Sequence, residues 1–197
     1  MSVRDVISAL TWHRAVDSVT LVGSRARGEA IELSDWDFKV ETNDFRSVER
    51  SLVELVAPLG PLAQQWDRLS KRACYMLLLK EMGKVDLIFN EPWEPKGPWV
   101  VGSTTLPRID DHFWDWTIWL AAKDRQGKQE LVVSELRKMH EHLLAPLGVA
   151  QIPSSLPDAV GAYVGARAGA ERQLAMALPR AVEDEVRRLL AEAGYAV

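Results

Sequence analysis

The stretch of sequence that decides the fold runs from residue 21 to residue 40. It reads Leu21-Val22-Gly23-Ser24-Arg25-Ala26-Arg27-Gly28-Glu29-Ala30-Ile31-Glu32-Leu33-Ser34-Asp35-Trp36-Asp37-Phe38-Lys39-Val40. The β-branched residues before the first glycine predict a strand over 18–22, which runs into a polar turn and a helical turn. A second strand is predicted over 35–41, and it begins with two acids separated by one residue. The stretch therefore predicts a strand, a turn and a second strand with an acidic pair at its start.

The acidic pair, Asp35 and Asp37, lies on one face of its strand, because residues i and i+2 point to the same side. Two adjacent carboxylates repel each other unless a cation lies between them. Mg²⁺ suits this place, because it takes oxygen ligands and is usually held by one or two carboxylates together with substrate phosphates. The preceding turn supplies a flexible backbone, a hydroxyl and positive charge for a phosphate: Gly23, Ser24, Arg25 and Arg27.

A third acid, Asp86, stands alone in the otherwise apolar segment Lys84-Val85-Asp86-Leu87-Ile88-Phe89. If this strand lies beside the strand with the acidic pair, Asp86 joins the cluster. Asp86 could then ligate a second metal ion or accept the proton of an attacking hydroxyl, and the sequence leaves both roles open.

Taken together, these residues resemble the signature of the DNA polymerase β-type nucleotidyltransferase superfamily. The resemblance rests on Gly23-Ser24, then nine residues, then Ser34-Asp35-x-Asp37, and the later Asp86. It implies a nucleoside triphosphate as co-substrate and Mg²⁺, expected as two ions, held by Asp35, Asp37 and Asp86, which are also the expected catalytic residues. The nucleotide-binding residues expected from it are Gly23, Ser24, Arg25, Arg27 and Ser34.

Periodicity along the chain predicts an α+β protein with a mixed β-sheet flanked by helices, followed by a C-terminal helical bundle. The resemblance implies that the sheet is of the nucleotidyltransferase type. We expect a nucleotidyltransferase α/β domain over 1–95, a linker rich in proline over 96–108, and a helical bundle over 109–197. The segments expected in the first part are helices over 2–15 and 45–57 and strands over 18–22, 35–41, 62–69, 73–80 and 84–89.

Four helices are expected in the second part. They begin at Asp110 or Asp111, before Val132, near Pro157 and at Pro179. Three glycines share one face of the third helix, namely Gly161, Gly165 and Gly169, and they suggest that another backbone packs closely against it. The tryptophans at 114, 116 and 119 are expected in the core, with an aromatic wall for a ligand as the alternative.

The helical half has a weaker likeness to aminoglycoside and lincosamide nucleotidyltransferases. This likeness implies transfer of a nucleoside monophosphate to a hydroxyl of a small, antibiotic-like molecule, with release of pyrophosphate. Lys123 could reach the triphosphate or only stabilise the end of its helix. Further candidate bases in this half are Asp111, Asp115 and Glu130. Alternatives are the same chemistry on a protein or tRNA, or a non-catalytic, antitoxin-like interaction module. The bundle could instead form a homodimer.

Charge and hydropathy argue against several other classes of protein. The net charge is −4, shared equally by the two halves, so the basic surplus expected of a protein that binds polymeric nucleic acid is missing. No apolar run approaches the roughly 18 residues of a membrane helix, and the N-terminus does not resemble a signal peptide. We therefore expect a cytoplasmic protein that does not interact with membranes, with its single Cys74 buried as a small apolar residue.

Overall fold

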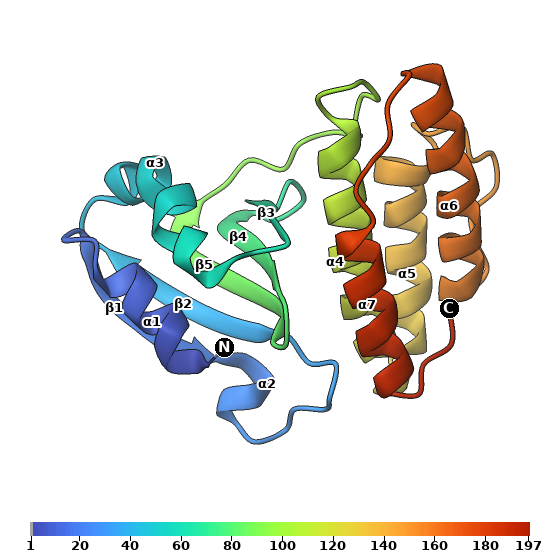
Figure 1. Ribbon diagram of the computed structural model, residues 1–197. Coiled ribbons are helices and arrows are strands. Elements are labelled where there is room, and N and C mark those ends of the chain that lie inside the picture. The colour runs from blue at the N-terminus through green and yellow to red at the C-terminus, as the bar shows by residue number, and fades with distance from the viewer. Residues whose placement is uncertain (1) are drawn as a thin grey trace. The chain divides into compact units, whose positions relative to one another are not determined.

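The computed structural model describes residues 2–197, and the chain divides into two compact units, Met1–Lys96 and Gly97–Val197. The first unit is a five-stranded sheet with helices, and the second is all helical (Figure 1). The elements of the first unit are α1 (Val3–Thr11), β1 (Val16–Val22), α2 (Gly23–Ala26), β2 (Trp36–Thr42), α3 (Phe45–Val56), the 3₁₀ turn η1 (Ala57–Leu59), β3 (Ala63–Trp66), β4 (Arg72–Leu79) and β5 (Gly83–Pro92).

The sheet has the strand order β1-β2-β5-β4-β3. Strands β2 and β5 are parallel, and every other neighbouring pair is antiparallel. In the register of the parallel pair, Asp37 lies opposite Asp86. On the other side of β2, Asp37 lies opposite Val22, the last residue of β1. The mixed sheet therefore brings two of the predicted acids, and the turn that follows β1, to one place.

One face of the sheet carries the apolar core of the first unit, and helices α1 and α3 cover it (Figure 1). Alternate residues of the central strands point into this core, among them Phe38 and Leu87, both fully buried. A capping box begins α1, in which the Ser2 backbone N–H donates to the Asp5 carboxylate at 2.7 Å. Asp37 and Asp86 occupy the alternate positions next to these residues and so lie on the opposite face of the sheet.

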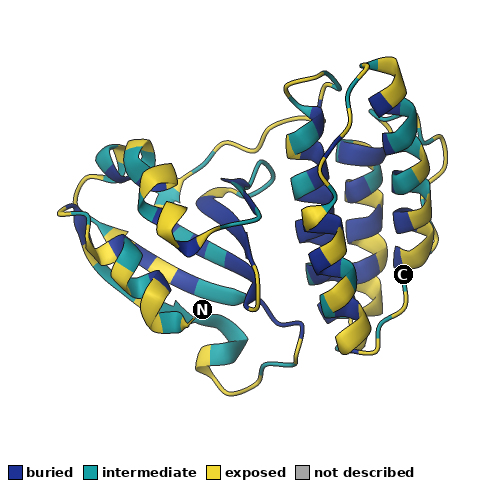
Figure 2. Ribbon diagram, in the orientation of Figure 1, coloured by how far each residue is buried: buried dark blue, intermediate teal, exposed yellow. Residues whose placement is uncertain are grey.

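The second unit is built from α4 (Leu106–Arg125), α5 (Gln129–Met139), the π-helical turn η2 (His140–Leu144), α6 (Leu156–Gln173) and α7 (Ala181–Glu192). The helices turn their buried residues toward one another and their exposed residues outward (Figure 2). Trp99, in the segment before α4, is also buried, and its backbone N–H donates to the carbonyl of His142 at 3.0 Å. No helix among residues 2–197 is long and apolar enough to cross a membrane.

An ionic network lies inside the helical unit. Arg167 on α6 donates to Asp110 on α4 at 2.9 Å and also to Glu183 on α7, and all three side chains are buried. The Tyr163 hydroxyl donates to the same Asp110 carboxylate at 2.6 Å. Because buried charges are tolerated only when they are paired, this network holds three helices in one arrangement.

The predicted fold class is confirmed, with a mixed five-stranded sheet, flanking helices and a helical C-terminal part. Some element boundaries differ. The first helix ends at Thr11, four residues before the predicted end, and α4 begins at Leu106 rather than at Asp110 or Asp111. Pro107 stands in the first turn of α4, where a missing N–H costs no hydrogen bond, so this proline starts the helix instead of preceding it.

The expected close approach of a backbone to the glycines of α6 is wrong. A Cβ atom placed on Gly161 or Gly165 would meet no atom within 4 Å, and both residues are exposed. The buried face of α6 is carried instead by residues such as Tyr163 and Arg167. The prediction that the tryptophans lie in the core is confirmed for Trp114 and Trp116, which are buried in the helical unit. The third, Trp119, is half-buried, and the Lys123 amine lies 4.9 Å from the centre of its ring. Cys74 is buried, as expected.

Candidate active site

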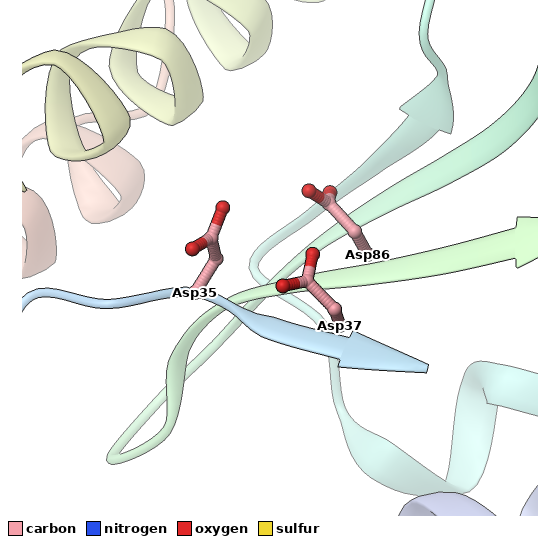
Figure 3. A group of neighbouring side chains, drawn as sticks. All are labelled: Asp35, Asp37 and Asp86. Carbon is pink, nitrogen blue, oxygen red and sulfur yellow. The ribbon is translucent and has the colours of Figure 1, made fainter. Parts of the chain in front are cut away.

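Three carboxylates converge on the face of the sheet that α1 and α3 leave open. Asp35 immediately precedes β2, Asp37 lies within β2, and Asp86 comes from the neighbouring strand β5 (Figure 3). One oxygen of each carboxylate lies within 4.8 Å of the others. This spacing suits a divalent cation with oxygen ligands, because mutual repulsion of the three acids falls when a cation lies between them. The donor set therefore fits Mg²⁺.

Gly23 gives the cluster the space it needs. It follows β1 directly and has φ of 71°, in the left-handed region that favours glycine. A Cβ atom at this position would overlap the Asp37 carboxylate and stand only 2.9 Å from its Cγ. The turn that begins at Gly23 therefore passes close against a site acid, as expected for a backbone that approaches metal-bound phosphates.

Arg25, in the short helix α2, holds the loop that carries Asp35. Its guanidinium donates to the carbonyl oxygen of Ser34 at 2.6 Å and 3.0 Å and to that of Asp35 at 3.2 Å. It also lies 3.9 Å from the centre of the Trp36 ring. Several of its N–H groups are thus engaged by the protein itself, which gives Arg25 a structural role that the sequence did not indicate. Its expected contact with phosphate remains a prediction.

The other residues expected at the nucleotide lie in different surroundings. Ser34 is buried, and its hydroxyl accepts the N–H of Ile31 at 2.9 Å, so it shapes the loop before Asp35. Arg27 is exposed and pairs with Glu29 at 2.7 Å. Ser24 lies in α2, beside Gly23. Lys123 belongs to the helical unit. For all four residues nucleotide binding remains a prediction.

Lys84 is the site residue that the sequence analysis missed. Its buried ammonium donates to Asp86 Oδ1 at 2.7 Å. Burial raises the pKa of the Asp86 carboxyl, and the Lys84 charge opposes this rise. The signal was present in the sequence, because residues 84 and 86 share one face of a strand. A lysine two positions before an isolated acid in an apolar strand therefore predicts a buried ion pair.

The three further candidate bases of the helical unit differ in how far they are buried. Glu130 is exposed, whereas Asp115 is buried. Asp111 is half-buried, and desolvation together with the neighbouring Asp110 raises the pKa of its carboxyl to about 7. A carboxyl with such a pKa can exchange a proton near neutral pH. Asp111 therefore remains a candidate base of the helical unit.

A mixed sheet with three clustered acids defines the class of the first unit, and comparison with known proteins gives its family. Residues 3–98 match the nucleotidyltransferase domain family, which confirms the superfamily inferred from the sequence. This part of the chain is a nucleotidyltransferase domain. A solved structure, an aminoglycoside 6-adenyltransferase from Bacillus subtilis, is similar over 97% of this chain and 98% of that chain, with 11% identity and a TM-score of 0.31. No curated protein sequence matches the chain.

Proposed function

We propose that the protein transfers a nucleoside monophosphate from a magnesium-bound nucleoside triphosphate to a hydroxyl of a small molecule. The observation that carries this proposal is the cluster of Asp35, Asp37 and Asp86 beside the glycine turn at residue 23, within a nucleotidyltransferase domain. Mg²⁺ would be held by Asp35 and Asp37. When bound, the ion neutralises charge on the triphosphate and on the oxygens of the displacement.

The protein's own residues have separate tasks in this reaction. The turn of Gly23 and Ser24 receives the phosphates, and Arg25 keeps the loop with Asp35 in place. The acceptor oxygen forms a bond to the α-phosphorus while the bond from that phosphorus to the bridging oxygen of the β-phosphate breaks. The proton of the acceptor hydroxyl passes to a carboxylate, for which Asp86 is the candidate on the sheet. Pyrophosphate leaves.

A small acceptor agrees with the charge of the chain. The net charge of −4, without a basic surplus in either half, does not favour binding to the backbone of a nucleic acid. Hydroxylated aminoglycosides and lincosamides are the acceptors to test first, because the sequence resemblance implies this class. Modification of such an antibiotic would give the protein a role in resistance. The helical unit would then bind the acceptor or mediate dimerisation.

Thermal unfolding tests the metal and nucleotide site. A triphosphate with Mg²⁺ should raise Tm, since a ligand that binds only the folded state stabilises it by mass action. With a chelator the rise should largely vanish, because triphosphate and acids then repel each other. Asp35→Asn and Asp37→Asn should each abolish the rise without unfolding the protein. The control Asp17→Asn, at an exposed acid of β1 outside the cluster, should leave it unchanged.

Pyrophosphate release tests the reaction. The four triphosphates are screened against a panel of hydroxylated antibiotics, with a tRNA and a protein mixture as further acceptors. Release that depends on an antibiotic supports the proposal, and release only with a macromolecule assigns the same chemistry to that acceptor. Binding of a triphosphate without any release would favour a non-catalytic interaction module and would contradict the proposed activity.

A further inference from the structure

We propose that Lys84 takes the place of a second divalent cation in the acidic cluster. The site would then bind one Mg²⁺ with its triphosphate, through Asp35 and Asp37, in place of the two ions expected from the sequence. The inference rests on the proposed function, because it concerns the metal of that site. Lys84 acts through Asp86 and is thus a positioning residue.

The position of Lys84 carries the first step. It lies on β5 two residues before Asp86, so both side chains leave the same face of the sheet. Only 5% of the Lys84 side chain and 14% of the Asp86 side chain are exposed, and the Lys84 Nζ donates to Asp86 Oδ1 at 2.7 Å. The ammonium is therefore a fixed part of the cluster and not a mobile surface charge.

Repulsion between cations is the second step. A magnesium ion on Asp86 would stand about 2.1 Å from its carboxylate oxygen, so an ion that shared Oδ1 with Lys84 would lie within about 5 Å of the ammonium. Because both side chains are largely buried, water screens this repulsion poorly. The other two acids of the cluster, Asp35 and Asp37, supply further carboxylate oxygens for a single ion.

The charge of the cluster is the third step. Three carboxylates and one ammonium leave a formal charge of −2, which a single divalent ion balances before the triphosphate arrives. The phosphates then bring their own negative charge, and they bind to the turn after β1 and to the bound ion. Asp86, oriented by Lys84, stays outside the metal's ligands. Its carboxylate is then available to the hydroxyl of the acceptor as a base.

Counting bound Mn²⁺, as a substitute for Mg²⁺, tests the inference on the full chain. Free Mn²⁺ is measured by electron paramagnetic resonance while the ion is titrated into protein saturated with a non-hydrolysable triphosphate. We expect one tightly bound ion in the unaltered protein and in Lys84→Arg, which keeps the positive charge. Lys84→Met removes the charge at similar length and should bind two ions, with all three acids as ligands.

A matched control is Lys39→Met. Lys39 also forms an ion pair of 2.7 Å with a carboxylate two residues away, Glu41, but it is half exposed and lies outside the cluster. This variant should keep one ion. Circular dichroism verifies the fold of each variant. If Lys84→Met does not fold, Lys84→Gln serves for the same count, since its neutral amide can still donate a hydrogen bond to Asp86.

The outcomes separate the two proposals. Two ions in the unaltered protein, or one ion in the neutral Lys84 variants, would overturn the role of Lys84 while leaving the proposed function intact. No ion in the unaltered protein, even with the triphosphate, would overturn the proposed function and this inference with it. One ion in the unaltered protein and two in the neutral variants supports both.

Discussion

At Gly23 the backbone and the Asp37 carboxylate compete for the same space. Gly23→Ala should destabilise the fold by about 1–2 kcal/mol, the cost of a left-handed backbone for an L-residue, and should also displace Asp37. We therefore expect a weaker rise of Tm with magnesium and triphosphate. The matched control is Gly28→Ala, where φ is 72° but a Cβ atom would meet nothing within 4 Å. This variant should lose stability and keep the nucleotide response; equal responses in both variants would contradict the steric role of Gly23.

The raised pKa of Asp111 predicts a pH dependence of stability. The folded protein holds this proton up to about pH 7, whereas an unfolded aspartate loses it near pH 4. Between these values the folded state binds more protons, so the contribution of Asp111 to the free energy of unfolding falls as pH rises. Asp111→Asn should therefore be more stable than the unaltered protein at pH 8, by roughly 1–3 kcal/mol, because one unit of pKa shift corresponds to about 1.4 kcal/mol.

Urea unfolding at pH 4 and pH 8 measures this effect. Below about pH 4 Asp111 is neutral in both the folded and the unfolded state, so the advantage of the variant should disappear there. An advantage of the same size at both pH values would show that removal of this charge is not its cause.

Residues of the candidate site were predictable from the sequence where the alternation of side chains along a strand decides which face of the sheet they point to. Asp35 and Asp37 follow from their spacing, and Lys84 could have been found by the same rule. The role of Arg25 could not, because its hydrogen-bond partners are carbonyl groups of a loop about ten residues later in the chain. How an irregular loop folds back depends on tertiary contacts that local patterns do not encode.

Among the elements, α6 offers a clear test of helix propensity. Gly161 and Gly165 lie on its exposed side with free space around them. Gly161→Ala and Gly165→Ala should each stabilise the protein by roughly 0.5–1 kcal/mol, because alanine has less backbone freedom to lose on folding. The free energy of unfolding in urea measures the gain. The opposite result is expected for Gly194→Ala, which follows α7 with φ of 70°. A loss of stability in the two α6 variants would reveal a backbone contact at this face.

Most elements were predictable because their residues carry a clear period. All five strands of the sheet appear close to their predicted places, and the acid of β5 stands out in an apolar run. The strand ends were less certain: β3 spans only Ala63–Trp66, half of the predicted 62–69. The pairing of the strands could not be predicted from the sequence either. The parallel contact of β2 with β5 depends on the packing of the whole sheet and not on either strand alone.

At the scale of the molecule, each unit has its own interior, and the helical one includes the ion network around Arg167. Arg167→Met should lower the free energy of unfolding by about 3 kcal/mol, since loss of one partner leaves a buried charge unbalanced. The cost stays near the lower end of the usual range because Tyr163 still contacts Asp110 and Arg187 still contacts Glu183.

Urea unfolding followed by the helical signal in circular dichroism measures this loss. The control is Arg46→Met on α3, whose ion pair with Glu49 involves a side chain that is 77% exposed. Exposed pairs contribute little, so this variant should change stability by less than about 1 kcal/mol. Equal losses in the two variants would contradict a structural role for the buried network.

The parallel pairing of β2 with β5 also bears on how the first unit folds. Asp37 and Asp86 lie opposite each other although about 50 residues separate them in the chain. Closing a loop of this length costs entropy that only the finished sheet recovers. The chain between the two strands includes α3, β3 and β4, so we expect the two carboxylates to meet only late in folding. Before the two strands pair, Asp86 lies far from Asp35 and Asp37, so the chain should have a low affinity for a divalent ion. The affinity for the metal should therefore arise together with the native topology.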